Sequence, residues 1–147
     1  MNKVIFKPYV MNQQKRMPPS YEEKIAAGHL VRQVNEAIEA LDLDILLAQY
    51  EGGGTSSYHP KMMLKVLVYA YCKKIYTSRR IAEALEENIH FMWLSGEQTP
   101  DFRTLNDFRG RRMKGVIEEV FTAVVEQLVA KGYMKMENYY VDGSKVE

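Results

Sequence analysis

The chain has 147 residues, of which 46% are hydrophobic and 27% charged, a balance typical of one folded domain and not of a disordered segment. Its single cysteine, Cys72, excludes a disulfide within the chain and fits a reducing cytoplasm. No apolar run approaches the ~20 residues that span a bilayer, and the N-terminus lacks a signal-peptide pattern, so we expect no membrane partner.

The distribution of charge is more informative than the net charge of +1. Residues 61–114 carry eleven cations and six acids, a net charge of +5, whereas residues 1–60 and 115–147 have net charges of −1 and −3. A positive excess in the middle of the chain indicates a polyanionic partner.

Residues 1–19 are predicted to form an extended arm. Pro8, Pro18 and Pro19 disfavour a helix there, and the run Val4-Ile5-Phe6 has the composition of a short strand. The arm is therefore predicted to precede a helical domain, which we place at residues 20–135.

Two helices are predicted at the start of that domain. Ser20, followed three residues later by Glu23, is a capping pair that predicts a short helix ending at Gly28. Apolar residues then recur at helical spacing over residues 29–41, which predicts a second, amphipathic helix.

The middle of the chain combines a joint with two closely connected helices. Residues 51–57, Glu-Gly-Gly-Gly-Thr-Ser-Ser, form the clearest flexible joint. Pro60 suits the start of the next helix, over residues 61–75, which is apolar nearly all round and should be the buried centre. A connection of about three residues leads to a helix over residues 79–88. This spacing is that of a helix-turn-helix, although any small helical bundle has such corners.

Three further helical segments follow. Residues 90–94 should make one turn that packs aromatic side chains inward. A basic helix is predicted over residues 104–113, with Asp101 or Thr104 as its cap. A long helix with a continuous apolar stripe is predicted over residues 116–130. The fold class is therefore a mainly α helical bundle.

Two groups of basic residues, accompanied by short polar donors, lie near the ends of these helices, where side chains commonly contact DNA phosphates. The alternative is a solvated basic face, in which Glu83, Glu86 and Glu87 pair with arginines of their own helix. The residues that we assign to DNA binding are Lys73, Lys74, Thr77, Ser78, Arg79, Arg80, Arg103, Thr104, Asn106, Arg109, Arg111, Arg112 and Lys114.

The last ten residues change to a strand pattern in which Asp142 follows Tyr-Tyr-Val. Asp142 with Gly143 is either a hairpin turn or a carboxylate at the end of a strand, and spacing alone favours the turn. The three histidines, His29, His59 and His90, have no partner at metal-ligand spacing, so we interpret them as structural.

Taken together, these segments resemble the N-terminal part of DDE-type insertion-sequence transposases, the group with an InsH-like N-terminal domain. The matching blocks, in family order after the Phe6-Lys-Pro-Tyr arm, are PPSYEEKIAAGHLVRQVNEAIEALDLD, EGGGTSSYHPKMMLKVLVYAY, SRRIAEALEENIHFMWLSG, PDFRTLNDFR and YYVDGSKVE. One departure is Arg103, where the family often has a small hydroxyl residue. This difference adds a candidate phosphate contact.

The resemblance implies a helical domain that binds the double-stranded DNA of transposon ends, followed by an RNase H-like catalytic domain that begins at residues 136–147. In that family two aspartates and a glutamate hold Mg²⁺ or Mn²⁺ for strand cleavage and transfer. Asp142 matches the first aspartate, as catalytic and metal residue, whereas Glu147 does not match the glutamate. The other two carboxylates are expected beyond residue 147, so this chain alone is expected to be inactive and to hold no cofactor.

The resemblance further implies a homo-oligomer in the full-length protein and a place in the bacterial cytoplasm, on the nucleoid. It implies no small-molecule substrate. Two alternatives stay open at this point: a dimerisation or packing module of the transposase without DNA affinity of its own, and a free-standing helix-turn-helix regulator.

Overall fold

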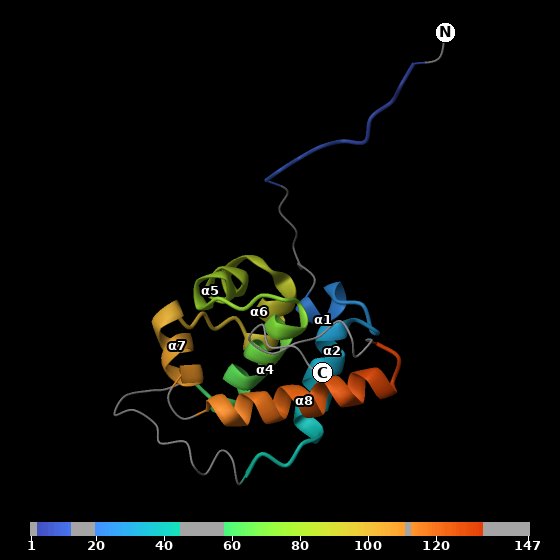
Figure 1. The fold of residues 1–147 in the computed structure, drawn as a ribbon. Helices are drawn as coiled ribbons and strands as arrows, with labels where there is room; N and C mark the ends of the chain where they lie inside the picture. The colour runs from blue at the N-terminus through green and yellow to red at the C-terminus, as the bar shows by residue number, and fades with distance from the viewer. Residues whose placement is uncertain (1–2, 13–19, 45–57, 111–112, 134–147) are drawn as a thin grey trace.

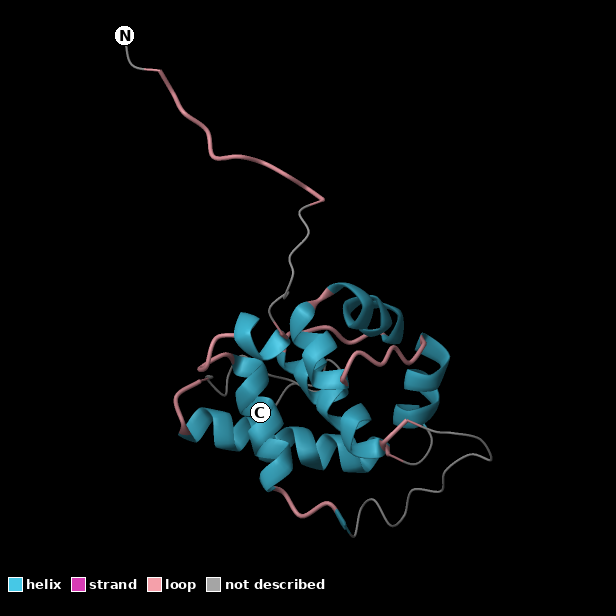
Figure 2. Cartoon of the chain, turned by 180° about the vertical axis from the view of Figure 1, so that it is seen from behind, coloured by secondary structure: helices cyan, strands magenta, loops and turns pink. Residues whose placement is uncertain are grey.

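The structure is a computed structural model that describes residues 3–12, 20–44, 58–110 and 113–133. Figures 1 and 2 show that the described residues form helices and loops, without a strand among them, so the mainly α class is confirmed. The helices are α1 (Tyr21–Lys24), α2 (Leu30–Ala40), α4 (Pro60–Cys72), α5 (Ser78–Glu87), α6 (Ile89–Ser95), α7 (Phe102–Gly110) and α8 (Lys114–Ala130).

Helix α4 is the centre of the fold. Pro60 lies in its first turn, and His59 caps it by accepting a hydrogen bond at Nδ1 from the N–H of Lys61 at 3.1 Å. Helices α2, α6 and α8 pack around it. Burial raises the pKa of the Cys72 thiol to about 12, as expected for a thiol in an apolar core. The buried residues of α4 are Met63, Leu64, Val66, Leu67, Val68, Tyr69, Ala70, Tyr71 and Cys72, which confirms the predicted buried centre.

The end of α4 differs from its prediction. The helix ends at Cys72, three residues before the predicted end at residue 75. Lys74 takes up a left-handed conformation with φ of 61°, and the N–H of Ile75 donates to the carbonyl of Ala70 at 2.8 Å. This is a common helix stop, but its left-handed residue is usually glycine, so the sequence does not mark it. The connection to α5 is therefore five residues long, not three.

The helix-turn-helix prediction rested on this connection. In the structure α5 packs mainly against α6 and α7, and its contacts with α4 are few. Its inner face is formed by Ser78, Ile81 and Leu85, which are buried. The neighbours that position α5 are therefore α6 and α7, both of which follow it in the sequence.

Other helix boundaries also differ from the predictions. Helix α1 ends at Lys24, before Gly28, because the backbone of Ile25 is already extended. Helix α7 begins two residues earlier than predicted, and its cap is Asp101, whose Oδ1 accepts a hydrogen bond from the N–H of Thr104 at 2.8 Å. Helix α8 also begins two residues early, at Lys114, and includes Gly115 in its first turn.

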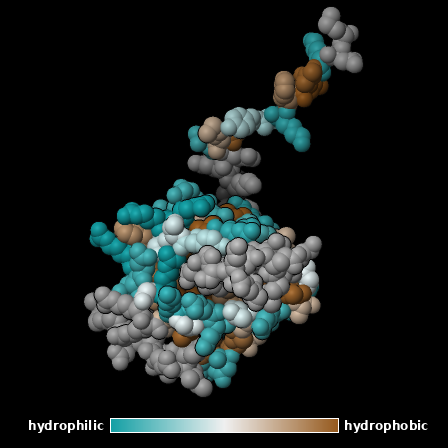
Figure 3. Space-filling view, in the orientation of Figure 1, coloured by the Kyte–Doolittle hydropathy of each residue, from teal (hydrophilic) through white to brown (hydrophobic). Residues whose placement is uncertain are grey.

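The N-terminal arm has neither helix nor strand over residues 3–10, turns at residues 11–12, and projects from the helices (Figure 1). The predicted strand at Val4-Ile5-Phe6 is wrong, since none of the described residues pairs with it. These three side chains are 76–90% exposed, and Figure 3 shows hydrophobic residues along the arm. An arm of this kind lacks the backbone partner that a strand requires.

Several predictions fall on residues outside the described ranges. They concern the joint at residues 51–57, the pair Arg111 and Arg112, and the strand with Asp142 at residues 138–147. Within the described residues, no helix has the length and hydropathy needed to cross a membrane.

The left-handed Lys74 leads to a test of the α4 stop. We expect Lys74→Gly to raise the free energy of unfolding by roughly 0.5–1 kcal/mol. A residue with a side chain in the left-handed backbone conformation costs about 1–2 kcal/mol, and glycine removes this cost. The greater entropy of glycine in the unfolded chain offsets part of the gain. Lys73→Gly is the matched control, since the φ of Lys73 is −91° and the change should destabilise. Urea denaturation measures both, and an equal loss in the two variants would contradict the assignment.

Candidate nucleic-acid interface

The first turn of α5 carries two arginines. Thr77 caps the helix, with its Oγ1 accepting a hydrogen bond from the N–H of Arg80 at 3.3 Å. Arg79 and Arg80 are exposed, and no acidic residue lies in this turn. A helix N-terminus already has partial positive charge, so two cations there raise the local potential further and favour an anion.

A hydrogen bond between side chains joins the start of α5 to α7. The Ser78 hydroxyl donates to Oδ1 of Asn106 at 2.6 Å, and Ser78 is buried. Both residues were predicted as DNA contacts. The Ser78 hydroxyl and Oδ1 of the exposed Asn106 join α5 to α7, and DNA contact by these two residues stays a prediction.

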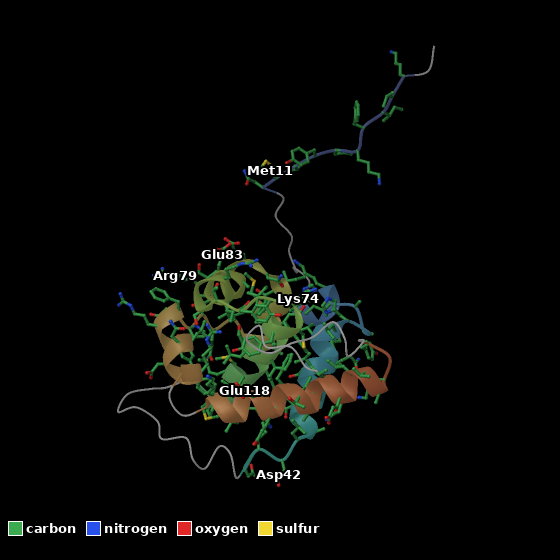
Figure 4. The ribbon with its side chains drawn as sticks, in the orientation of Figure 1. Met11, Asp42, Lys74, Arg79, Glu83 and Glu118 are labelled. Atoms are coloured by element: carbon green, nitrogen blue, oxygen red, sulfur yellow. The ribbon has the colours of Figure 1, made fainter. Side chains whose placement is uncertain are left out.

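Phe102, the first residue of α7, organises the arginines on either side of it. The Arg79 guanidinium carbon lies 3.9 Å from the centre of the Phe102 ring, and that of Arg103 lies 5.6 Å from it. Cations within about 6 Å of an aromatic ring are attracted by its quadrupole. One ring thus gathers two guanidinium groups from two helices, and Figure 4 shows Arg79 where α5 and α7 meet.

Arg109, near the end of α7, is half-buried. Its Nη1 donates to the backbone carbonyl of Tyr76 and, at 3.4 Å, to the hydroxyl of Tyr71. The guanidinium therefore ties α7 both to α4 and to the connection that leads into α5. Arg109 differs in this respect from the exposed Arg79, Arg80 and Arg103.

Three cations elsewhere in the described residues form ion pairs. Glu39 on α2 binds both Lys61 and Lys65 of α4, and these lysines lower the pKa of its carboxyl to about 2. Arg32 forms an ion pair with Glu22 and also donates to backbone carbonyls around the turn between α1 and α2.

The arginines of α5 and α7 differ from these paired cations. Helix α5 is described throughout, and neither Arg79 nor Arg80 forms an ion pair with Glu83, Glu86 or Glu87. Arg103 has no ion pair within the described residues either. The predicted intrahelical ion pairs are therefore absent from α5, while the alternative of a solvated basic face stays open.

We call this surface the α5–α7 edge and define it by Thr77, Arg79, Arg80, Phe102 and Arg103. The predicted residues that the structure brings to this edge or just beneath it also include Ser78, Thr104, Asn106 and Arg109. Lys73 and Lys74 lie elsewhere: Lys73 is close to His29 and His90, and Figure 4 shows Lys74 toward α1 and α6. Lys114 lies at the start of α8.

Sequence reasoning missed Phe102 as the residue that gathers the arginines. An aromatic residue directly after a helix cap and next to an arginine is a weak signal. Its contact with Arg79, from another helix, depends on how α5 and α7 pack, which the sequence pattern does not specify.

Fold and site together define a small helical domain with an unpaired cationic edge. The profile of the family described as Transposase domain (DUF772) matches residues 19–111, more than half of the chain, and the chain belongs to this family. The match confirms the transposase resemblance at the level of the family and indicates a role in transposition. Neither the curated proteins nor the solved structures contain a match to the chain.

His29 and His90 form a second cluster of titratable groups. Their rings stack with centroids 3.9 Å apart and planes inclined by 14°. His29 caps α2, since its Nδ1 accepts a hydrogen bond from the N–H of Val31 at 3.0 Å. In the described residues no group of three or more His, Cys, Asp and Glu side chains is arranged to hold a metal ion.

The environment of this pair disfavours protonation. Partial burial lowers the pKa of both rings below 6.5, and neighbouring cations add to this effect. For His29 these are Lys73 and Arg32, and for His90 they are the His29 ring and Lys73. Since both rings also lie at helix N-termini, a proton on either one meets unfavourable charge.

We therefore expect acid to destabilise the fold. Because the folded pKa values lie below those of the unfolded chain, the stabilisation is complete above about pH 6.5 and is lost as the pH falls toward the lowered folded pKa. Urea denaturation at pH 7.5 and 5.0 measures this loss. His29→Asn keeps a capping side chain and should reduce the pH dependence, whereas the matched variant Thr77→Asn, at a helix cap whose side chain does not titrate, should not. Identical pH dependence in the two variants would contradict this role of the pair.

Proposed function

We propose that the chain is the DNA-binding N-terminal region of a DDE-type transposase, and that the α5–α7 edge contacts the phosphates of transposon-end DNA. The observation that carries the proposal is the group of unpaired arginines in the first turns of α5 and α7, two of which share the Phe102 ring. Membership of the transposase-domain family supports it.

The electrostatics of the edge fit a phosphate backbone better than a single small anion. Arginine presents a planar set of donors that matches phosphate oxygens. Arg79 and Arg80 stand in the first turn of α5, where a cation opposes the helix dipole in the absence of an anion. A polyanion lying across both helix starts would relieve this repulsion at α5 and at Arg103 together.

The proposal sets the salt dependence of binding. Each phosphate neutralised on duplex DNA contributes about −0.9 to the slope of log affinity against log salt concentration. If Arg79, Arg80 and Arg103 each contact one phosphate, the edge contributes a slope of roughly −2.7. Further contacts, among them those of Arg111 and Arg112, would add to it.

The same proposal includes the catalytic domain, the metal ions, the oligomer and the helix-turn-helix that the transposase resemblance implies. Asp142 would be the first metal-binding carboxylate of an RNase H-like domain, and Mg²⁺ or Mn²⁺ would serve cleavage and strand transfer once the other two carboxylates are supplied. The full-length protein would act as a homo-oligomer on bacterial DNA. A helix-turn-helix within the domain would place α5, with α7 beside it, toward the duplex.

A second candidate function is assembly of the transposase. It is favoured by the arm, where Val4, Ile5, Phe6, Tyr9, Val10 and Met11 are all exposed. Apolar surface of this kind gains about 25 cal/mol for each Å² that a protein partner covers. Analytical ultracentrifugation distinguishes the candidates, since a tight dimer without DNA affinity supports assembly alone.

The DNA proposal is tested with two double variants of equal charge change. Arg79→Ala with Arg103→Ala should weaken duplex binding and reduce the magnitude of the salt slope by about 1.8, the share of two phosphate contacts. Lys24→Ala with Lys131→Ala removes two exposed cations outside the edge and should leave the slope nearly unchanged. Fluorescence anisotropy over a salt series measures affinity, and circular dichroism checks the fold. Equal effects of the two pairs would show that the edge is not the DNA contact.

A further inference from the structure

A pocket of about 280 Å³ opens where α4, α7 and α8 meet. Its lining residues are Tyr71, Arg109, Gly110, Lys114, Ile117 and Glu118. A water molecule takes up about 30 Å³ of liquid, so the pocket has room for a phosphate group with several waters. The pocket lies outside the α5–α7 edge but is connected to it through Arg109.

Arg109 is held in place before any ligand arrives. Its Nη1 donates to the Tyr76 carbonyl and to the Tyr71 hydroxyl, while the side chain also lines the pocket. A guanidinium has five N–H donors, so these two bonds leave donors for a ligand. Because the side chain is already ordered, a ligand need not immobilise it on binding.

Lys114 adds an exposed positive charge on the other side of the pocket. It is the first residue of the seventeen-residue helix α8, where a cation is unfavourable, and Met113 provides no side-chain cap. Within the described residues Lys114 forms no ion pair, although Glu118 lies one turn further along the same helix and lines the same pocket. This arrangement is costly for an isolated protein and favourable once an anion is bound.

We propose that this pocket seats one phosphodiester group of the DNA backbone between Arg109 and Lys114. The inference rests on the proposed function and identifies a contact distinct from the α5–α7 edge. Arg109 and Lys114 attract an anion, and Glu118, which lines the same pocket, reduces this attraction.

Lys114 gives the most direct test, because it is exposed and forms no ion pair with any residue that the structure describes. Lys114→Gln should reduce the magnitude of the salt slope of duplex binding by about 0.9, the share of one phosphate. Lys131→Gln, at the opposite end of α8, is the matched control and should leave the slope unchanged. Thermal melting followed by circular dichroism checks that both variants fold as the wild type does.

The outcomes separate this inference from the proposed function. If the wild type does not bind the duplex, the proposed function fails. If it binds and the Arg79 and Arg103 double variant weakens binding, while Lys114→Gln and Lys131→Gln have the same slope, only the phosphodiester seat is overturned.

The role of Glu118 is tested with inorganic phosphate, which is titrated while the amide signals of Gly110 and Lys114 are followed by nuclear magnetic resonance. Glu118→Gln removes the repelling charge and should strengthen phosphate binding by roughly fivefold over the wild type. Glu126→Gln, on the same helix but outside the pocket, should not. Equal phosphate affinity in the wild type and Glu118→Gln would overturn the role of Glu118.

Discussion

The burial of α4 is the constraint on which the rest of the structure depends. Its apolar surface is covered by α2, α6 and α8, and this packing fixes where its last turn lies. From that turn Tyr71 and the following connection reach Arg109 of α7. The positions of α5 and α7, and so of their arginines, follow from a core in which no described residue is charged. A change in this core would therefore affect the cationic edge without touching any of its residues.

The cations discussed above fall into two groups, those that form ion pairs and those that do not. Lys61, Lys65 and Arg32 are used within the fold, where they join α2 to α4 and close the turn after α1. At the α5–α7 edge the arginines have no ion pair in the described residues, and they stand in first turns, where helices favour acids. Local rules of stability are commonly broken at functional sites, and this is the reason for assigning the partner to this edge.

The helical core could be predicted because its signals are local. The apolar run of α4 and the stripe of α8 depend on spacing within one segment, and the structure confirms them. The predicted end of α4 was wrong because Lys74, and not a glycine, takes up the left-handed conformation that ends the helix.

The contacts that build the site depend on packing. The predicted donors Ser78 and Asn106 are 28 residues apart and bond to each other. The stacking of His29 on His90, and of Arg79 on Phe102, joins segments whose sequences give no sign of pairing. Such contacts follow from how helices pack, and the period of an apolar stripe does not determine that arrangement. The residue types of the site were therefore predictable, while their partners were not.

The most direct test of the α5–α7 edge is to map the duplex on the protein by nuclear magnetic resonance. Backbone amide signals of the labelled chain are followed while a DNA duplex is added at low salt. If the α5–α7 edge binds the duplex, the largest changes in the amide signals fall on residues 77–80 and 101–104, and these changes become smaller as the salt concentration is raised. Changes confined to the arm at residues 3–12, or to the outer face of α8, would contradict it.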